Sequence, residues 1–364
     1  MSLRLSHSQY NRFLSCGKSY EHYYINKIKP TRPKASLLFG TAIDRAISTL
    51  LEPKDESKTP EQTFDYFWRF QDVNGKQEYL PKLSTLLYSN KDFDKDLLLD
   101  EDYQKIQEEY SLDKDQALEL LSKRIEVGHD KLPKKEKEPS NFIIWLSMMR
   151  KGHVMIKGFR EKILPRIKRV ITTQECITLE NGDGDKIIGY IDLVAETEGH
   201  EGPVILDVKT AASPYDDDAH LFAPQLILYL HASREKYSNT NKAGFIVLGK
   251  NIMKNKTKIC SSCGHDGTGG RHKTCDNEVD GKRCNSAWLE KINPECFTQV
   301  MVVEVPEATE ELVMSNIEDM TNAIKAGHFI RNLSNCKNMY GSPCEYIDLC
   351  YRGKMDNLKK EEKV

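Results

Sequence analysis

Long apolar runs are missing from this sequence. No stretch of about 18 consecutive apolar residues occurs, so no membrane-spanning helix is predicted. The N-terminal segment MSLRLSHSQYNRF also lacks the apolar core of a secretion signal. We therefore expect a cytoplasmic protein without a membrane partner, placed in the host-cell cytoplasm if a phage encodes it.

An excess of charge of either sign is also absent. The 364 residues include 53 lysines and arginines and 55 aspartates and glutamates, which gives a net charge of −2. Composition therefore neither favours nor excludes a nucleic-acid partner, and such a contact must come from a local patch. The segment 150–169 has eight basic residues and one acid, and we interpret it either as a solvated helix face or as such a patch.

Hydrophobic periodicity changes along the chain and predicts helices and strands in alternation. A helix with a capping box at Ser6 and Gln9 opens the sequence, and a second helix begins near Leu37. The segment 131–141 is predicted to be an exposed linker. Strands are predicted over 169–179, 186–196, 203–211, 242–250 and 299–306, and further helices over 141–168, 217–237 and 307–327.

This alternation predicts an α/β protein with a mixed central sheet flanked by helices. We expect five units along the chain. They are the N-terminal helices of the core domain (1–51), a helical insertion (52–140), the core (141–250), a cysteine-rich insertion (251–295) and the C-terminal part of the core domain (296–364).

Two acidic residues stand inside apolar strands, and a lysine follows the second. The motif G-x-x-D ends at Asp192, and after fourteen residues D-x-K runs from Asp207 to Lys209. A carboxylate is costly to bury unless it is paired or holds a metal ion. Strand alternation places Asp207 and Lys209 on one face, and Asp192 meets them if the strands are neighbours. Two carboxylates and the Val208 carbonyl suit Mg²⁺ or Mn²⁺.

Such an arrangement supports hydrolysis of a phosphodiester. The ion would acidify a water and polarise the phosphoryl oxygen, while Lys209 would orient the water and stabilise charge on the phosphate. A simple ion pair of Asp207 with Lys209 is the alternative interpretation. Gln225 and Tyr229, four residues apart on the next predicted helix, share a face that could hold phosphate or base groups; an ordinary amphipathic helix edge is the alternative.

The order G-x-x-D, D-x-K, Q-x-x-x-Y resembles the RecB-like nuclease family of the PD-(D/E)xK superfamily, which includes the CRISPR-associated exonucleases. The resemblance runs from about residue 6 to residue 350, outside 52–140 and 251–295. It implies a restriction-endonuclease-like core. It also implies Asp192 and Asp207 as metal ligands, Lys209 as the catalytic lysine, and Gln225 and Tyr229 as nucleic-acid contacts.

The family also has an upstream helix reading G-x-x-x-H, whose histidine binds the metal ion. Here Gly40 is followed at that spacing by Asp44, so the resemblance implies Asp44 as a substituted ligand. A carboxylate remains a good ligand for Mg²⁺ or Mn²⁺. The departure leaves the metal preference open and admits a weakened enzyme.

The ten cysteines are clustered, which favours metal sites over disulfides in a chain without a secretion signal. Family members with an iron–sulfur cluster have one cysteine before the core and three after it. Cys16, Cys336, Cys344 and Cys350 have this order, which implies a 4Fe–4S cluster that ties the ends of the domain together. The last three are spaced more widely than in the family, and Gly17 replaces a proline. Zinc on the same thiols, or no metal, stays open.

A second group of cysteines predicts a zinc ribbon, because a C-x2-C pair is followed by two more cysteines after a glycine-rich turn. Its members are Cys260, Cys263, Cys275 and Cys284. His265 or His272 could replace one of them. The segment has almost no apolar core and would need the ion to fold. Lysines before it favour contact with a DNA backbone, and a purely structural role is the alternative. Cys176 and Cys296 remain as expected packing residues.

Together these features predict a Mg²⁺- or Mn²⁺-dependent DNA exonuclease that acts on single strands or duplex ends, in recombination, repair or phage DNA processing. A helicase or a recombinase is a candidate partner. Two alternatives stay open. One is a structure-specific or RNA-directed nuclease, such as a structure-specific endonuclease. The other is a non-catalytic DNA-binding scaffold, which the Asp44 substitution favours.

Overall fold

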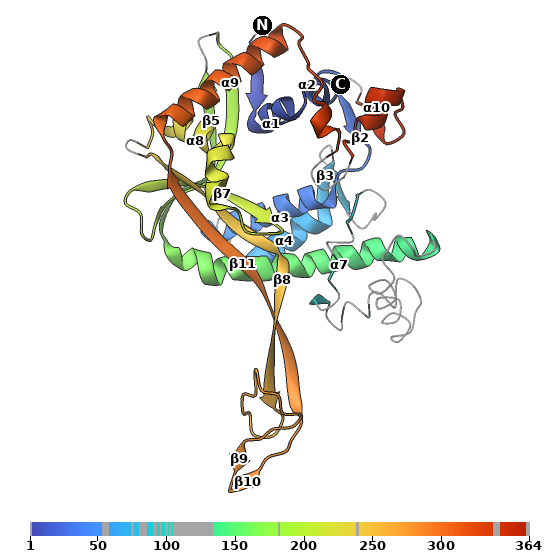
Figure 1. The fold of residues 1–364 in the computed structure, drawn as a ribbon, viewed down its shortest axis with the longest axis vertical. Coiled ribbons are helices and arrows are strands. Elements are labelled where there is room, and N and C mark those ends of the chain that lie inside the picture. Colours follow the sequence, from blue (N-terminus) through green and yellow to red (C-terminus); the bar gives the residue numbers. More distant parts are fainter. Residues whose placement is uncertain are drawn as a thin grey trace.

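A six-stranded mixed sheet with helices on both faces forms the body of the protein (Figure 1). This confirms the predicted α/β class with a central mixed sheet. The computed structural model describes residues 2–52, 58–73, 76–79, 86–89, 93–94, 97–98, 101, 104, 134–180, 183–237, 240–337 and 343–361. Within these residues, no helix is both long and apolar enough to cross a membrane.

The central sheet contains the three strands predicted around the acidic motifs and three others. Its strands are β1 (Arg4–Ser6), β5 (Ile167–Glu180), β6 (Lys186–Thr197), β7 (Pro203–Ala211), β8 (Lys242–Cys260) and β11 (Trp288–Glu304). β7 and β8 are parallel, whereas β6 pairs with β7 and β8 pairs with β11 in antiparallel fashion. The three-residue β1 is too short for its periodicity to have predicted it.

β6 is the strand at which the sheet divides. One of its edges pairs with β5 from Lys186 to Thr197. The other edge therefore serves two neighbours: β1 pairs in parallel over 186–188, and β7 pairs in antiparallel fashion over 193–196. Residues 189–192 lie between these two pairings, and they are the G-x-x-D motif. The motif is thus placed where one edge of the sheet opens.

Apolar side chains from both faces of the sheet make two core clusters. α3 (Ala35–Leu51), α4 (Pro60–Arg69) and α7 (Lys134–Gly158) cover one face, and α1 (His7–Ser15), α8 (Pro224–Ser233) and α9 (Glu307–Lys325) cover the other. Alternate residues of β7 divide between them: Val204 and Leu206 pack with the first group of helices, and Ile205 packs with the second. This alternation is the period-two pattern of a strand buried on both sides.

The N-terminal and C-terminal segments of the chain meet on one side of the molecule (Figure 1). The capping box at Ser6 and Gln9 is present as predicted, but the first helix is not continuous. α1 ends at Ser15 and is followed by α2 (Gly17–Tyr20) and a π-helical turn, Glu21–Ile25. β2 (Ile28–Pro30) then pairs with β12 (Leu358–Lys360), which follows α10 (Ile347–Arg352).

Two predictions outside the core need correction. The segment predicted as an exposed linker is helical from Lys134 onward, where α7 begins. The predicted helical insertion does contain α4, but also an antiparallel pair, β3 (Phe70–Val73) and β4 (Lys76–Tyr79). Most of 80–133 lies outside the described residues.

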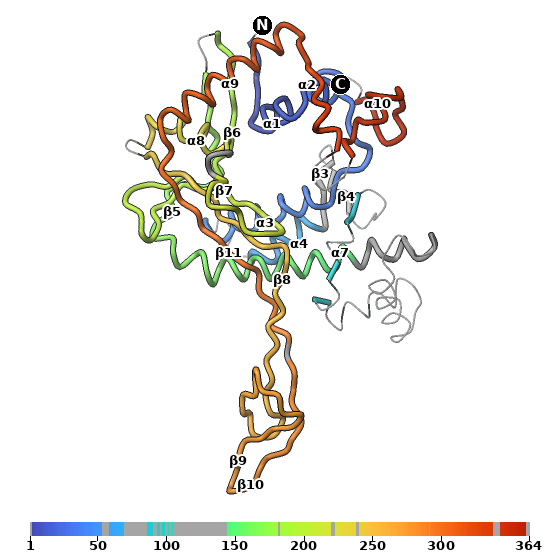
Figure 2. The backbone as a smooth tube through the Cα atoms, viewed as in Figure 1, coloured from blue at the N-terminus to red at the C-terminus, as the bar shows by residue number. Residues whose placement is uncertain are grey.

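β8 and β11 continue beyond the sheet as a two-stranded arm, with the cysteine-rich segment at its tip (Figures 1 and 2). The predicted strand 242–250 extends to Cys260, and its partner begins at Trp288 rather than at residue 299. The register is continuous from Trp288–Cys260 to Cys296–Ile252 and shifts at one irregularity before Thr298. The tip also carries the two-residue strands β9 (Glu278–Val279) and β10 (Lys282–Arg283).

Several cations of the basic segment 150–169 form ion pairs. Four of its cations contact acids on other elements: Arg150–Glu101, Arg160–Glu61, Lys162–Glu295 and Arg169–Glu196. Lys151 is buried. Of the two cysteines expected to be packing residues, Cys296 is buried, but Cys176 is exposed and the prediction is wrong for it.

Candidate functional site

The two motif carboxylates lie on adjacent strands. Asp192 Oδ2 on β6 accepts the Val208 backbone N–H of β7 at 2.8 Å. Asp207 is 1% exposed, and its Oδ2 lies 2.5 Å from Lys209 Nζ. Burial raises the pKa of Asp207, although Lys209 and a hydrogen bond with Asp192 oppose the rise. The structure thus brings Asp192, Asp207 and Lys209 together, including the ion pair expected as an alternative.

A chain of hydrogen bonds continues from Lys209 to the following helix. Lys209 Nζ donates to Gln225 Oε1 at 3.0 Å, and Gln225 Nε2 donates to Tyr229 Oη at 2.7 Å. Burial opposes protonation of Lys209, but the charge and hydrogen bond of Asp207 outweigh it, so the pKa of Lys209 is raised. Lys209 therefore remains a cation held between a carboxylate and an amide.

Gly189 makes room for Tyr229. A Cβ atom at Gly189 would lie 2.6 Å from Tyr229 Cε1 and 3.3 Å from Ile177 Cγ1. Both distances are shorter than ordinary contacts, so a larger residue would displace the tyrosine ring. The glycine of G-x-x-D thus has a steric role, in the stretch of β6 that lies between β1 and β7.

Asp44 reaches the same site from α3. Its Oδ1 accepts Gln174 Nε2 of β5 at 3.0 Å. Burial raises the pKa of Asp44, and the charge of Asp207 adds to the rise. Burial likewise raises the pKa of Asp192 to about 8, with further contributions from Asp207 and Asp44. Three carboxylates are therefore close enough for their charges to interact.

The donor chemistry of this set of residues suits a divalent cation, although the three carboxylates do not all bring an oxygen within 4.8 Å of one another. Lys209 is one cation among three carboxylates, and negative charge in excess of it is costly to enclose. Asp207 Oδ2 is buried, and the ammonium group of Lys209 lies 2.5 Å from it. Carboxylate and carbonyl oxygens are the ligands that Mg²⁺ and Mn²⁺ prefer. Residues that would hold such an ion are Asp44, Asp192, Asp207 and the Val208 carbonyl.

Two residues of the site were not predicted. Gln174 stands opposite Asp192 in the register of β5 and β6, in a left-handed backbone conformation with φ of 50°. Its neighbour Glu175 pairs with Lys236 at 2.6 Å. His7, at the start of α1, has a buried Nε2 without a hydrogen-bond partner among the described residues. Burial, and then Lys209, lower the pKa of His7 to about 4.

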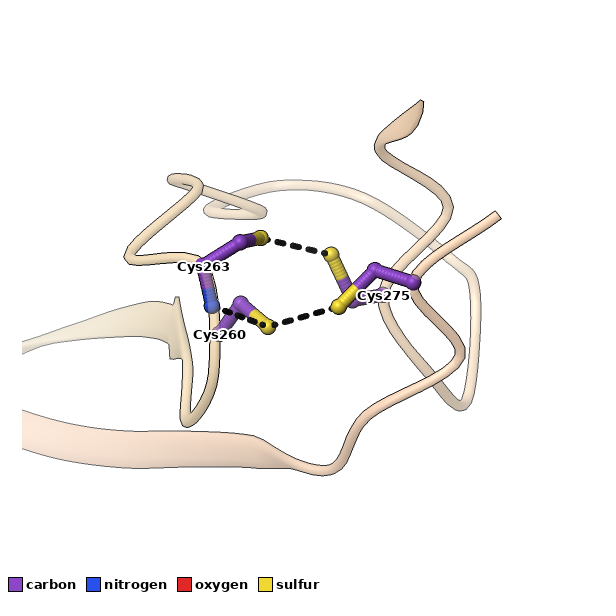
Figure 3. Close-up of side chains that lie close together, drawn as sticks. Cys260, Cys263 and Cys275 are labelled. Atoms are coloured by element: carbon purple, nitrogen blue, oxygen red, sulfur yellow. Dashed lines mark hydrogen bonds between the residues drawn. The ribbon is translucent and has the colours of Figure 1, made fainter. Parts of the chain in front are cut away.

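The four cysteines at the tip of the arm form a compact group (Figure 3). Among the described residues, they form the one group of three or more histidine, cysteine, aspartate or glutamate side chains whose ligand atoms all lie within 4.8 Å of one another. The Sγ atoms of Cys260 and Cys284 are 3.5 Å apart, and those of Cys263 and Cys275 are 3.6 Å apart. Two backbone N–H groups, those of Cys263 and Ser262, lower the pKa of Cys260 to about 6. The group could hold one metal ion. Its geometry does not require His265 or His272.

The other four cysteines surround a small cavity where the two ends of the chain meet. The cavity is lined by Cys16, Cys336, Cys344 and Cys350. Their sulfur atoms are more widely spread than those of the arm. Cys350 Sγ lies 3.5 Å from His22 Nε2, and Cys16 Sγ accepts the Asn332 backbone N–H at 3.4 Å. Gly17 fits against Ile330, whose backbone would lie 2.9 Å from an added Cβ atom.

Known proteins were found that resemble this chain over nearly its whole length. The family model described as the PD-(D/E)XK nuclease superfamily matches residues 4–351. Among solved structures, a proposed exonuclease from Eubacterium rectale is similar, with a TM-score of 0.40 and 11% sequence identity over 96% of this chain and 93% of that chain. No curated protein matches.

Proposed function

Because the chain belongs to the PD-(D/E)XK nuclease superfamily, we propose that it is a metal-dependent nuclease that hydrolyses DNA phosphodiesters with Asp192, Asp207 and Lys209. The observation that carries the proposal is the meeting of these three side chains on β6 and β7, with Lys209 Nζ 2.5 Å from Asp207 Oδ2. An ion pair alone does not account for the site, because two further carboxyl groups, those of Asp44 and Asp192, lie close enough to interact with it.

Each residue of the proposed active site has its own role. Asp192, Asp207, Asp44 and the Val208 carbonyl hold a Mg²⁺ or Mn²⁺ ion. When bound, the ion supplies Lewis acidity toward the scissile phosphate and a more acidic water. Lys209 directs its ammonium group toward the attacking water and the phosphate oxygens, and Gln225 fixes its direction by accepting one of its three protons. Gln225 and Tyr229 contact the nucleic acid beside the scissile bond.

The test is cleavage of end-labelled DNA with Mg²⁺ or Mn²⁺. We expect degradation by the wild-type protein and a loss of at least about 100-fold in kcat for Lys209→Ala, because a charge-stabilising group is removed from the transition state. A matched control is Lys359→Ala, which removes an exposed lysine on β12. Retained cleavage by Lys209→Ala would contradict the proposal. Absence of cleavage by the wild-type protein would favour a DNA-binding scaffold.

The finer assignment is an exonuclease on single strands or duplex ends, in recombination, repair or phage DNA processing. Its support is the RecB-like motif order, which includes Gln225 and Tyr229. Single-stranded DNA, duplex, flap and RNA substrates assayed side by side distinguish this activity from that of a structure-specific or RNA-directed nuclease. The same proposal includes a helicase or recombinase as partner. It also includes the division of the chain into a nuclease core, 141–250, with insertions on either side.

We also propose a zinc ion at the arm tip and a 4Fe–4S cluster at the terminal cysteines. A single zinc ion with Zn–S bonds of about 2.3 Å needs four sulfur atoms close to one another, as at the tip. A four-iron cluster binds each thiolate through a different iron atom, which suits the wider terminal set around its cavity. An anaerobic preparation with metal analysis and a visible spectrum tests both. A colourless protein with two zinc ions would contradict the cluster.

A further inference from the structure

A second cavity, of about 300 Å³, opens beside the proposed active site. Its walls come from the C-terminal half of α3, from α4 and from β5. It reaches the site through Gln174, which lines the cavity and also donates its amide to Asp44 Oδ1 at 3.0 Å. Arg45, another lining residue, follows Asp44 directly in α3. The cavity and the carboxylates are therefore separated by one side chain.

The cavity has the side chains of an anion site. Arg45 and Lys58 line it, both are exposed, and neither forms an ion pair with any residue that the structure describes. Glu52 is the one acidic residue among the lining residues. Hydroxyl groups of serine and threonine residues complete the polar wall. Two cations without an ion-pair partner among the described residues, set against one acid in the lining, favour an anionic ligand.

An aromatic side chain lies next to these cations. Phe67, 37% exposed, lines the cavity, and the Arg45 guanidinium lies over its ring at 5.8 Å from the centroid. Tyr66, on the same helix, has the Lys58 ammonium 5.7 Å from its ring centroid. Exposed rings combined with cations are typical of sites for single-stranded nucleic acid, where bases stack and phosphates pair with basic groups.

The backbone of Gln174 gives an independent reason to regard this edge as functional. Its φ of 50° interrupts the ladder of β5 opposite Asp192, while the residues on both sides, Thr173 and Glu175, keep their register. A left-handed non-glycine residue inside a strand is strained, and such strain persists where the surroundings require it. Here the conformation directs the amide toward Asp44 and the cavity, while Glu175 points to Lys236.

We propose that this cavity binds the nucleotide next to the scissile phosphate of a single-stranded DNA substrate. The phosphate of that nucleotide lies between Arg45 and Lys58, and its base and sugar contact Phe67. Gln174 connects this subsite to the metal ligand Asp44. The inference rests on the proposed nuclease function and names the substrate form that the site accepts.

The test measures, by fluorescence anisotropy, how tightly a fluorescein-labelled single-stranded DNA of about ten nucleotides binds. All variants are made in the cleavage-deficient Lys209→Ala protein. Arg45→Ala and Lys58→Ala should each weaken binding about tenfold, the effect of losing one hydrogen bond to a charged group. Each should also reduce the slope of log affinity against log salt by about 0.7. Lys359→Ala is the matched control and should change neither quantity.

The outcomes separate the two proposals. If the wild-type protein cleaves DNA but Arg45→Ala and Lys58→Ala bind single strands as tightly as the parent does, the subsite is contradicted and the nuclease assignment stands. If both variants lose affinity equally for duplex and for single strands, the single-strand assignment is wrong. Circular dichroism melting of each variant should match that of the parent, because both side chains are exposed. If the wild-type protein does not cleave DNA, the nuclease assignment is contradicted, whatever the binding measurements show.

Discussion

At the scale of single residues, Asp192 has a strongly perturbed environment. It is half-buried, and the nearby charges of Asp207 and Asp44 add to the effect of burial, so its pKa rises to about 8. A carboxylic acid with a raised folded-state pKa stabilises the fold only below its unfolded value, near 4. That stability is lost as the pH rises from about 4 through 8. The site is thus least stable where a divalent ion would bind best.

We expect Asp192→Asn to raise the melting temperature at pH 8 in the absence of added Mg²⁺ or Mn²⁺. The asparagine carries no charge, so the gain should shrink towards pH 5, where Asp192 of the folded protein is already protonated. Thermal unfolding between pH 5 and pH 8 measures this. The exposed Asp216→Asn serves as the control. An equal loss of stability at both pH values would show that packing, not charge, decides the effect.

Sequence patterns identified Asp192, Asp207 and Lys209 because acids in apolar strands are rare enough to be informative. They did not identify Gln174, because its role depends on a positive backbone φ that a glutamine in a strand pattern does not predict. His7 was missed for a related reason. Its position beside Lys209 follows from the pairing of β1 with β6, which joins segments about 180 residues apart.

At the scale of elements, the division of β6 between β1 and β7 is what opens the site. The periodicity of apolar residues predicted β5, β6 and β7 within two residues of their ends. It missed the outer halves of β8 and β11, because an arm that is solvated on both faces has no alternation of apolar and polar residues. Two prolines made 131–141 resemble a linker, yet α7 begins directly after the first of them.

Substitution of the motif glycine tests this opening. Gly189→Ala should displace Tyr229, lower nuclease activity about tenfold or more, and destabilise the fold by about 1–3 kcal/mol through overpacking. Gly40→Ala is the matched control. Its Cβ atom would meet Thr210 Oγ1 at 3.9 Å, an ordinary contact, and alanine favours the helix by about 0.5–1 kcal/mol. Steady-state cleavage and melting curves decide, and equal effects of both alanines would contradict the steric role of Gly189.

At the scale of the whole molecule, segments from both termini close the domain. β2 pairs with β12, and Cys16 shares a cavity with three cysteines beyond residue 335. The order of the cysteines gave the sequence a signal for this closure, whereas two three-residue strands gave none. Pairing between such distant short strands depends on the surrounding fold and not on local pattern.

Removal of one terminal cysteine should open this closure. We expect Cys16→Ser to abolish iron binding and visible absorbance, and to lower stability by up to about 6 kcal/mol, the chain-entropy value for a closed loop of about 320 residues. Cys176→Ser, at an exposed cysteine, is the control and should change neither. Anaerobic metal analysis, absorption spectra and thermal unfolding provide the measurements. An unchanged melting temperature for Cys16→Ser would refute the stapling role.

The antiparallel pair of β2 with β12 also joins an early and a late product of translation. Ile28 leaves the ribosome long before its partner Lys360 has been translated, so this pair can form only when nearly the whole chain has been made. An incomplete product released early would lack this pairing. This pairing therefore belongs to the last contacts that the chain can form during its synthesis.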